Sequence, residues 1–136
     1  MFGPHGTPPL PSGLKLSEEL IGRTAILALE GEFDLYTAPE VDRAVDLTLR
    51  RFPRRLVVDL SQVGFLNSAG LEVLAACHRQ TDLRVVATTR STWRPLRIAG
   101  LHEVLAIHTS RAAAIAAPEP GEPTPQTGLS AEDKAV

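Results

Sequence analysis

The distribution of apolar and polar residues predicts a β-hairpin followed by an amphipathic helix at the start of the folded region. Two apolar runs, at residues 14–20 and 24–29, flank a short turn that contains Gly22, the pattern of a strand pair. Residues 37–52 then place apolar side chains at helical spacing, and Pro53 ends the pattern. A sheet that begins with antiparallel strands is therefore expected.

The rest of the chain alternates strands with helices. Further strands are expected at residues 56–60, 83–88 and 104–108, and further helices at 68–80, 91–99 and 110–117. The run at 56–60 is continuously apolar, which is typical of strands covered on both faces in a parallel sheet. The order of elements predicts an α/β fold with a mixed, largely parallel sheet of four to five strands, about four helices and right-handed crossovers.

The first helix begins with a capping-box pattern. Thr37 stands where the helix starts, Glu40 follows three residues later, and Pro39 suits the first turn. The sequence therefore predicts that the Thr37 hydroxyl caps this helix.

Composition divides the chain into one domain and two tails. Residues 1–13 and 118–136 are rich in proline and have little to bury, so disordered tails are expected around a single domain at 14–117. The domain carries 13 basic and 12 acidic residues, whereas the C-terminal tail has a net charge of −3. This balance gives no indication of a nucleic-acid partner. Basic residues cluster only at Arg50, Arg51, Arg54 and Arg55, with no aromatic residues between them for base stacking.

Compartment and membrane association follow from cysteine usage and hydropathy. Cys77 is the only cysteine and stands in an apolar helical run, which favours a buried thiol without a disulfide. No apolar run approaches the roughly 20 residues that span a bilayer, and the N-terminus lacks a signal-peptide pattern. A cytoplasmic protein without a membrane partner is expected.

Ser68 is the residue with the clearest chemical potential. It lies between the apolar strand at 56–60 and the helix at 68–80. The first N–H groups of a helix lack intrahelical partners and favour negative charge. On position alone, Ser68 is a helix cap or a serine that carries a phosphate. No Gly-x-Ser-x-Gly elbow surrounds it, and His78, His102 and His108 have no triad or metal-ligand spacing with it. Catalysis, a metal site and a cofactor are therefore not expected.

Three patterns in the same order as in a known family give this chain a resemblance to the STAS domains, in particular to bacterial anti-sigma factor antagonists. The first is Gly31-Glu32-Phe33-Asp34 followed by Thr37-Ala38-Pro39-Glu40, similar to the turn into the family's first helix. The second is 57–61 with Phe65-Leu66-Asn67-Ser68-Ala69-Gly70-Leu71, similar to its strand, loop and Asp-Ser-[Ser/Thr]-Gly-Leu segment. The third is Arg94, Leu96, Ile98 and Gly100-Leu101.

The resemblance implies a regulator of transcription, of the kind used in stress responses, that is not an enzyme. In the family, the unphosphorylated antagonist binds an anti-sigma factor of the GHKL serine-kinase type and frees the sigma factor, and the phosphorylated form lets go. The matching phosphoacceptor is Ser68, and Asp34 matches the family's interface aspartate. A serine phosphatase is a further candidate partner, and a monomer is expected when the protein is free.

The expected partner surface is one corner of the domain. It comprises Asp34, Asn67, Ser68, Ala69, Gly70, Leu71, Thr89, Arg90 and Ser91. Asn67 stands where the family usually has aspartate, which keeps the capping ability and removes the charge.

Several alternatives stay open at the level of sequence. One is a STAS-like structural subunit of an ABC-type lipid-transport complex in which Ser68 is not phosphorylated. Another is a nucleotide-sensing domain, for which no phosphate-binding Gly-rich loop is present. Trp93 suits the core and an exposed interface equally, and Leu71 also fits both, whereas Phe65 and Leu66 are expected in the core.

Overall fold

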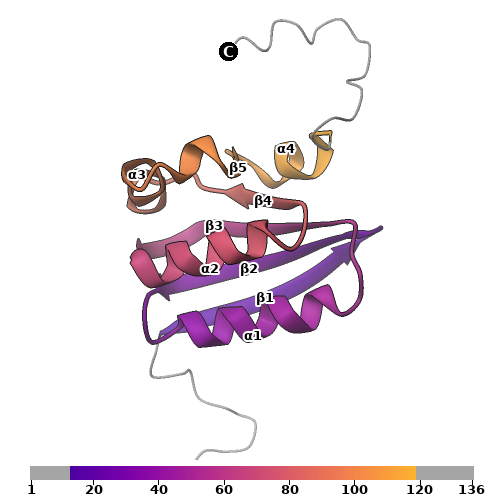
Figure 1. Cartoon of the computed structure of the whole chain (residues 1–136), viewed down its shortest axis with the longest axis horizontal. Helices are drawn as coiled ribbons and strands as arrows, with labels where there is room; N and C mark the ends of the chain where they lie inside the picture. Colours follow the sequence, from indigo (N-terminus) through magenta and orange to yellow (C-terminus); the bar gives the residue numbers. More distant parts are fainter. Residues whose placement is uncertain (1–12, 119–136) are drawn as a thin grey trace, which may run out of the picture.

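The computed structural model describes residues 13–118 of the 136-residue chain. These residues form five strands, four α-helices and one 3-10 turn (Figure 1). In chain order they are β1 (Leu14–Ile21), β2 (Thr24–Phe33), α1 (Ala38–Leu49), β3 (Arg55–Leu66), α2 (Ser68–His78), β4 (Leu83–Val86), α3 (Arg90–Ile98), η1 (Leu101–Glu103), β5 (Ala106–His108) and α4 (Arg111–Ala116). The predicted α/β class is confirmed.

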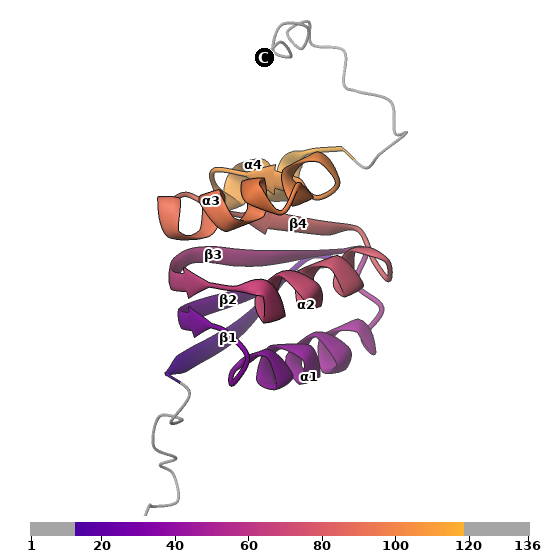
Figure 2. The same ribbon diagram turned by 60° about the vertical axis from the view of Figure 1, so that its left-hand side comes forward.

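The five strands make one sheet in which spatial order follows chain order, from β1 to β5. The hairpin partners β1 and β2 are antiparallel, and each later neighbour is parallel. Because every parallel connection advances in the same direction, right-handed crossovers put their helices on one face of the sheet. Figures 1 and 2 show α1 and α2 side by side on that face, with α3 and α4 at the end of the sheet where β4 lies.

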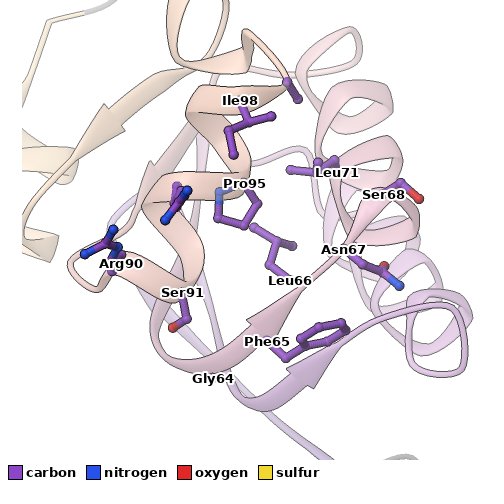
Figure 3. Close-up of a pocket in the computed structure, with 12 residues that line it drawn as sticks. Gly64, Phe65, Leu66, Asn67, Ser68, Leu71, Arg90, Ser91, Pro95 and Ile98 are labelled. Atoms are coloured by element: carbon purple, nitrogen blue, oxygen red, sulfur yellow. The ribbon is translucent and has the colours of Figure 1, made fainter.

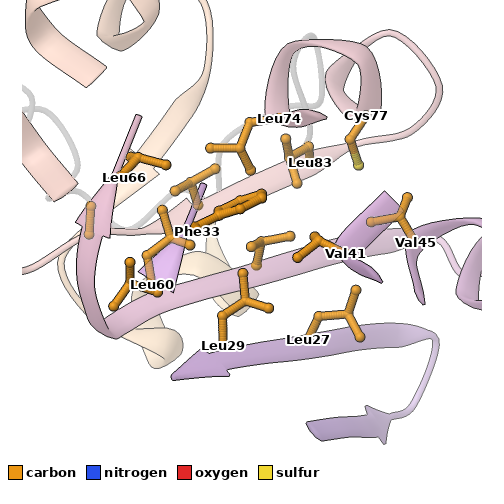
Figure 4. Close-up of a cluster of buried hydrophobic side chains, with 14 of the residues drawn as sticks. Leu27, Leu29, Phe33, Val41, Val45, Leu60, Leu66, Leu74, Cys77 and Leu83 are labelled. Atoms are coloured by element: carbon orange, nitrogen blue, oxygen red, sulfur yellow. The ribbon is translucent and has the colours of Figure 1, made fainter. Parts of the chain in front are cut away.

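A hydrophobic core joins the helices α1, α2 and α3 to this face. It includes Phe33, Val41, Leu60, Leu74 and Leu96, each at most 1% exposed (Figure 4). A smaller cluster lies on the other face, where α4 packs Ala114 against Ile26, Val57 and Val86.

Cys77 belongs to the larger core. Burial, with a smaller contribution from the charge of Asp42, raises the pKa of its thiol to about 12. The thiol therefore stays protonated and serves as a small apolar side chain, as predicted.

Charged side chains fix α4 to the sheet. The Arg111 guanidinium donates to the Asp59 carboxylate at 2.5 Å. Arg84, which is 1% exposed, forms two hydrogen bonds to Asp82 and donates to the carbonyls of Ala114 and Ala117 at 3.0 and 2.7 Å. These donors satisfy carbonyl groups that have no partner within the last turn of the helix.

The predicted capping box is wrong. Thr37 has helical backbone angles, and its side chain makes no capping hydrogen bond to α1. Its hydroxyl instead donates to the Glu32 carbonyl and accepts from the Asp34 N–H, each at 2.9 Å. Glu40 does not complete a box either, since its buried Oε1 has no hydrogen-bond partner among the described residues.

Two strands are longer than their apolar runs indicated. β2 continues past residue 29 to Phe33, and β3 continues past residue 60 to Leu66. The two extensions pair with each other as far as Phe33 and Leu66, with register shifts that accommodate the irregular stretch. Backbone pairing thus compensates for the weak apolar pattern of residues 61–65.

The predicted tails fall almost entirely outside the described residues. The N-terminal tail was expected at 1–13 and the C-terminal tail at 118–136, so only Gly13 and Pro118 are described. Among residues 13–118, no helix is long and apolar enough to cross a membrane.

Candidate functional site

Ser68 lies at the first position of α2, directly after the end of β3. Asn67 has extended backbone angles and caps the helix, because its side-chain oxygen accepts from the Ala69 N–H at 3.0 Å. Ser68 is exposed, and its hydroxyl points outward from the start of the helix (Figure 3). The capping interaction that the sequence allowed for Ser68 is thus made by Asn67, which leaves the serine hydroxyl accessible.

Gly70 lets α2 approach the core closely at this point. A Cβ atom on Gly70 would lie 2.7 Å from Leu66 Cδ1 and 3.0 Å from the Phe33 ring. Such distances are shorter than normal van der Waals contacts. The glycine of the motif therefore sets how near the first turn of α2 comes to the ends of β2 and β3.

The loop between β2 and α1 lies beside this turn. The Asn67 N–H donates to the Phe33 carbonyl at 3.3 Å, which joins the two segments. Asp34 follows Phe33, and its Oδ1 accepts from the N–H groups of Tyr36 and Thr37 at 2.9 and 3.1 Å. The Asp34 carboxylate therefore fixes the shape of the loop next to Asn67.

A groove of about 690 Å³ separates the start of α2 from α3 (Figure 3). Its floor and walls are mainly apolar, from Phe65, Leu66, Leu71, Pro95, Ile98 and Ala99. Polar side chains border it, from Asn67, Ser68, Arg90, Ser91 and Arg94. The combination can hold an apolar side chain of a partner while leaving Ser68 at its edge.

The start of α3 is held to β3 by the Ser91 hydroxyl. The Ser91 hydroxyl donates to the Val63 carbonyl at 3.3 Å and lies 3.0 Å from the Thr89 hydroxyl. The structure thus brings Asn67, Ser68, Leu71, Arg90 and Ser91 to one groove. The remaining predicted residues lie outside its lining: Asp34, Ala69, Gly70 and Thr89.

Exposed apolar residues gather around the same corner, and the sequence did not indicate them. Leu35 and Tyr36 are 65% and 78% exposed, and Ile98 is 74% exposed. Phe65 was expected in the core, but it is 49% exposed, whereas Leu66 is buried as predicted. Phe65 is near the end of β3, where no helix covers its side chain and the groove begins (Figure 3). Surface apolar residues in one place are typical of protein-binding sites.

Trp93 is also on the surface. It is 40% exposed, and the Arg97 guanidinium lies 5.0 Å from the centre of its ring. Of the two roles that the sequence left open, the structure supports the exposed one.

His78 and His108 are partly buried, and His102 is exposed. Burial and the nearby charge of Arg84 lower the pKa of His108. No group of three or more potential metal ligands occurs within residues 13–118.

Known sequences that are similar to this chain belong to one family. The family model described as "Mlab, STAS domain" matches residues 16–107. The anti-sigma-F factor antagonist RsfB of Mycobacterium tuberculosis is 36% identical over 90 residues, which cover 63% of this chain and 74% of RsfB. An anti-sigma-B factor antagonist of Listeria monocytogenes is 30% identical over 82 residues, 57% of this chain and 72% of the relative.

Solved structures agree. An anti-sigma factor antagonist from Mycobacterium paratuberculosis superposes with a TM-score of 0.74 at 30% identity, covering 78% of this chain and 94% of that one. Unphosphorylated SpoIIAA, at 14% identity and a TM-score of 0.64, shares the fold over 74% of this chain and 93% of its own. Antagonists of this kind are non-enzymatic regulators, which agrees with the sequence-based expectation. With its fold, its motifs and these relatives, the chain belongs to the STAS domain family, among the anti-sigma factor antagonists.

Proposed function

We propose that this protein binds an anti-sigma factor that is also a GHKL-type serine kinase, and that phosphorylation of Ser68 ends the interaction. Binding of the antagonist would occupy the anti-sigma factor and free its sigma factor for transcription. The groove between the start of α2 and α3, which Ser68 borders, is called the Ser68 groove. The partner surface consists of this groove together with the loop that carries Asp34, Leu35 and Tyr36. A serine phosphatase would restore the active form, and the free protein is a monomer in this proposal.

The observation that carries the proposal is the position of Ser68. Its hydroxyl is exposed at the first residue of α2, while Asn67 supplies the cap. A nucleophile in this position can reach an ATP-bound partner without any unfolding of the helix. The Ser68 oxygen would attack the γ-phosphorus of the partner's Mg-ATP, the bond to ADP would break, and a base on the partner would take the hydroxyl proton.

The electrostatics of the site suit a reversible switch. A phosphate adds about −1.5 to −2 charges, and the N-terminus of α2 tolerates an anion because its N–H groups and dipole favour negative charge. Binding of the partner is weakened by the phosphate, because the phosphate stands beside a mainly apolar groove and must lose its hydration when the complex forms. A loss of about 3 kcal/mol weakens binding roughly a hundredfold.

The test is phosphorylation by candidate anti-sigma kinases with Mg-ATP, followed by location of the phosphate by mass spectrometry. We expect phosphate on Ser68 and none in the Ser68→Ala variant. Ser17→Ala is the matched control, because Ser17 is an exposed serine on β1 that does not line the groove, and it should be modified like the native chain. Stable binding without phosphate on Ser68, when a known antagonist is modified under the same conditions, would contradict the switch. That outcome would favour an unregulated antagonist or a structural role.

A further inference from the structure

A cationic surface lies on α3, beside the Ser68 groove. Arg90, Arg94 and Arg97 are exposed, and within residues 13–118 no acidic side chain forms an ion pair with any of them. By contrast, Arg84 and Arg111 are paired with carboxylates. These three guanidinium groups on one short helix form a positive patch that attracts an acidic segment.

The patch is also concave. A second hollow of about 690 Å³ is lined by Thr88, Thr89, Arg90, Trp93, Arg94, Arg97 and Ile98. In it, the half-exposed ring of Trp93 lies next to the Arg97 guanidinium. We name this hollow the arginine surface. It combines fixed positive charges with apolar area, so an acidic peptide that also contains apolar or proline residues would match it.

We propose that the acidic C-terminal segment of this chain, residues 119–136, docks on the arginine surface of its own domain. The segment holds Glu119, Glu122, Glu132 and Asp133 against Lys134, a net charge of −3, and three prolines. Its charge is therefore opposite to that of α3, which has three arginines and no acidic residue.

The point of departure and the length of the segment permit this contact. Arg84 holds the Pro118 carbonyl at 3.2 Å, so the segment leaves the domain from α4. In Figures 1 and 2, α4 and α3 lie at the same end of the sheet. From Pro118 to Glu132 the chain extends up to about 45–50 Å, and a flexible stretch of that length has a root-mean-square span of roughly 20 Å. The radius of gyration of a domain of this size is only about 13 Å.

Tethering makes a weak contact sufficient. A short flexible connection gives an effective concentration on the order of 1 mM, so a segment with a dissociation constant of about that size would occupy its site half of the time. Since Arg90 and Arg94 also line the Ser68 groove, the docked segment would cover one side of that groove. Only this last consequence rests on the proposed function.

Trp93 provides a direct test, because it is the only tryptophan in the chain. Acrylamide quenching of its fluorescence is compared between the native full-length chain and a variant with a neutralised segment, Glu119→Gln, Glu122→Gln, Glu132→Gln and Asp133→Asn. At about 0.01 M salt, where the Debye length is roughly 30 Å, we expect the quenching constant of the native chain to be lower, by up to about twofold. At about 1 M salt, where the Debye length is roughly 3 Å, the two proteins should be quenched equally.

Two controls make the result specific. Neutralising two exposed acids of α1, Asp42→Asn with Asp46→Asn, should leave quenching unchanged. Removing charge from the surface, Arg90→Gln with Arg94→Gln, should abolish the effect of the segment while Arg97 stays against Trp93. Equal quenching of native and segment-neutral chains at low salt would overturn the proposal. So would a difference that survives loss of Arg90 and Arg94, or one that grows with protein concentration, since the latter indicates a second copy. None of these readouts requires an anti-sigma partner.

Discussion

At the scale of single residues, the start of α2 divides its tasks among neighbours. Asn67 caps the helix, Ser68 presents a hydroxyl, and Gly70 permits the close approach to Phe33. Because these tasks are separate, each can be changed without changing the others. The Ser68 side chain is exposed and does not cap the helix. Its replacement or modification should therefore leave the fold intact, as a reversible switch requires.

Replacing Asn67 tests the cap. We expect Asn67→Ala to lower the free energy of unfolding by about 1 kcal/mol, because the Ala69 N–H loses its acceptor. Asn67→Asp keeps the acceptor and adds a negative charge near the helix N-terminus, so it should raise stability by about 0.3–1 kcal/mol. Urea unfolding at neutral pH measures both. Equal stability of the alanine variant and the native chain would show that the cap contributes nothing.

Replacing Gly70 tests the close packing of α2. Gly70→Ala should lower the free energy of unfolding by about 1–3 kcal/mol, because the new methyl group would overlap Leu66 and the Phe33 ring. The gain in helix propensity, about 1 kcal/mol, offsets part of this loss. Gly64→Ala is the matched control, since a Cβ there meets no atom within 4 Å. The prediction fails if both variants have the same urea midpoint.

At the scale of elements, α4 depends on charged contacts more than the other helices do. It is only six residues long, and Ala114 is its one buried residue. Asp59 on β3 receives Arg111 from the start of this helix. Burial by itself would raise the pKa of Asp59, but hydrogen bonds from Arg111 and from the Ser61 N–H outweigh it and hold the pKa below its ordinary value.

This shift sets a pH dependence for stability. A carboxyl with a lower pKa in the folded state stabilises the fold above its unfolded pKa, near 3.8, and the stabilisation disappears as the pH falls through the folded value. We expect Asp59→Asn to cost about 1.5–3 kcal/mol at pH 7, typical for hydrogen bonds to charged groups, and progressively less in acid. Asp46→Asn, which removes an exposed ion pair with Arg50, should cost little at any pH. A constant cost of Asp59→Asn from pH 7 to acid, measured by urea unfolding, would contradict the assignment.

The elements also show what the sequence could predict. Apolar patterning located five strands and four helices, because all of them except β5 have at least one buried residue. It missed the continuation of β3 from Ser61 to Leu66, which depends on backbone pairing with β2 and leaves Phe65 exposed. The capping box failed for a similar reason, since the Thr37 hydroxyl is taken by Glu32 and Asp34. Competition among local hydrogen bonds is not visible in residue types alone.

At the scale of the whole molecule, the apolar groove and the exposed side chains of Leu35, Tyr36 and Phe65 lie where β2 and β3 end. The motif residues lie there because parallel strands bring their carboxyl ends to one edge of the sheet. Sequence reasoning placed Ser68 and its flanking residues at this edge, but the groove itself requires α3 to pack beside α2, a tertiary relation. Two exposed phenylalanines allow a comparison of the two ends of β3, since Phe65 is near its end, beside the groove, and Phe52 precedes its start.

Comparing these two phenylalanines separates an interface role from general surface hydrophobicity. Phe65→Ala should leave the urea midpoint nearly unchanged, because the side chain is half exposed, but it should weaken binding to an anti-sigma factor at least about tenfold, equivalent to about 1.4 kcal/mol. Phe52→Ala removes an equally large side chain that is 80% exposed, and it should not alter binding. Titration calorimetry with the unphosphorylated proteins measures both. Equal affinities of the two variants would place the partner elsewhere, since a groove that loses one wall cannot bind the same apolar side chain equally well.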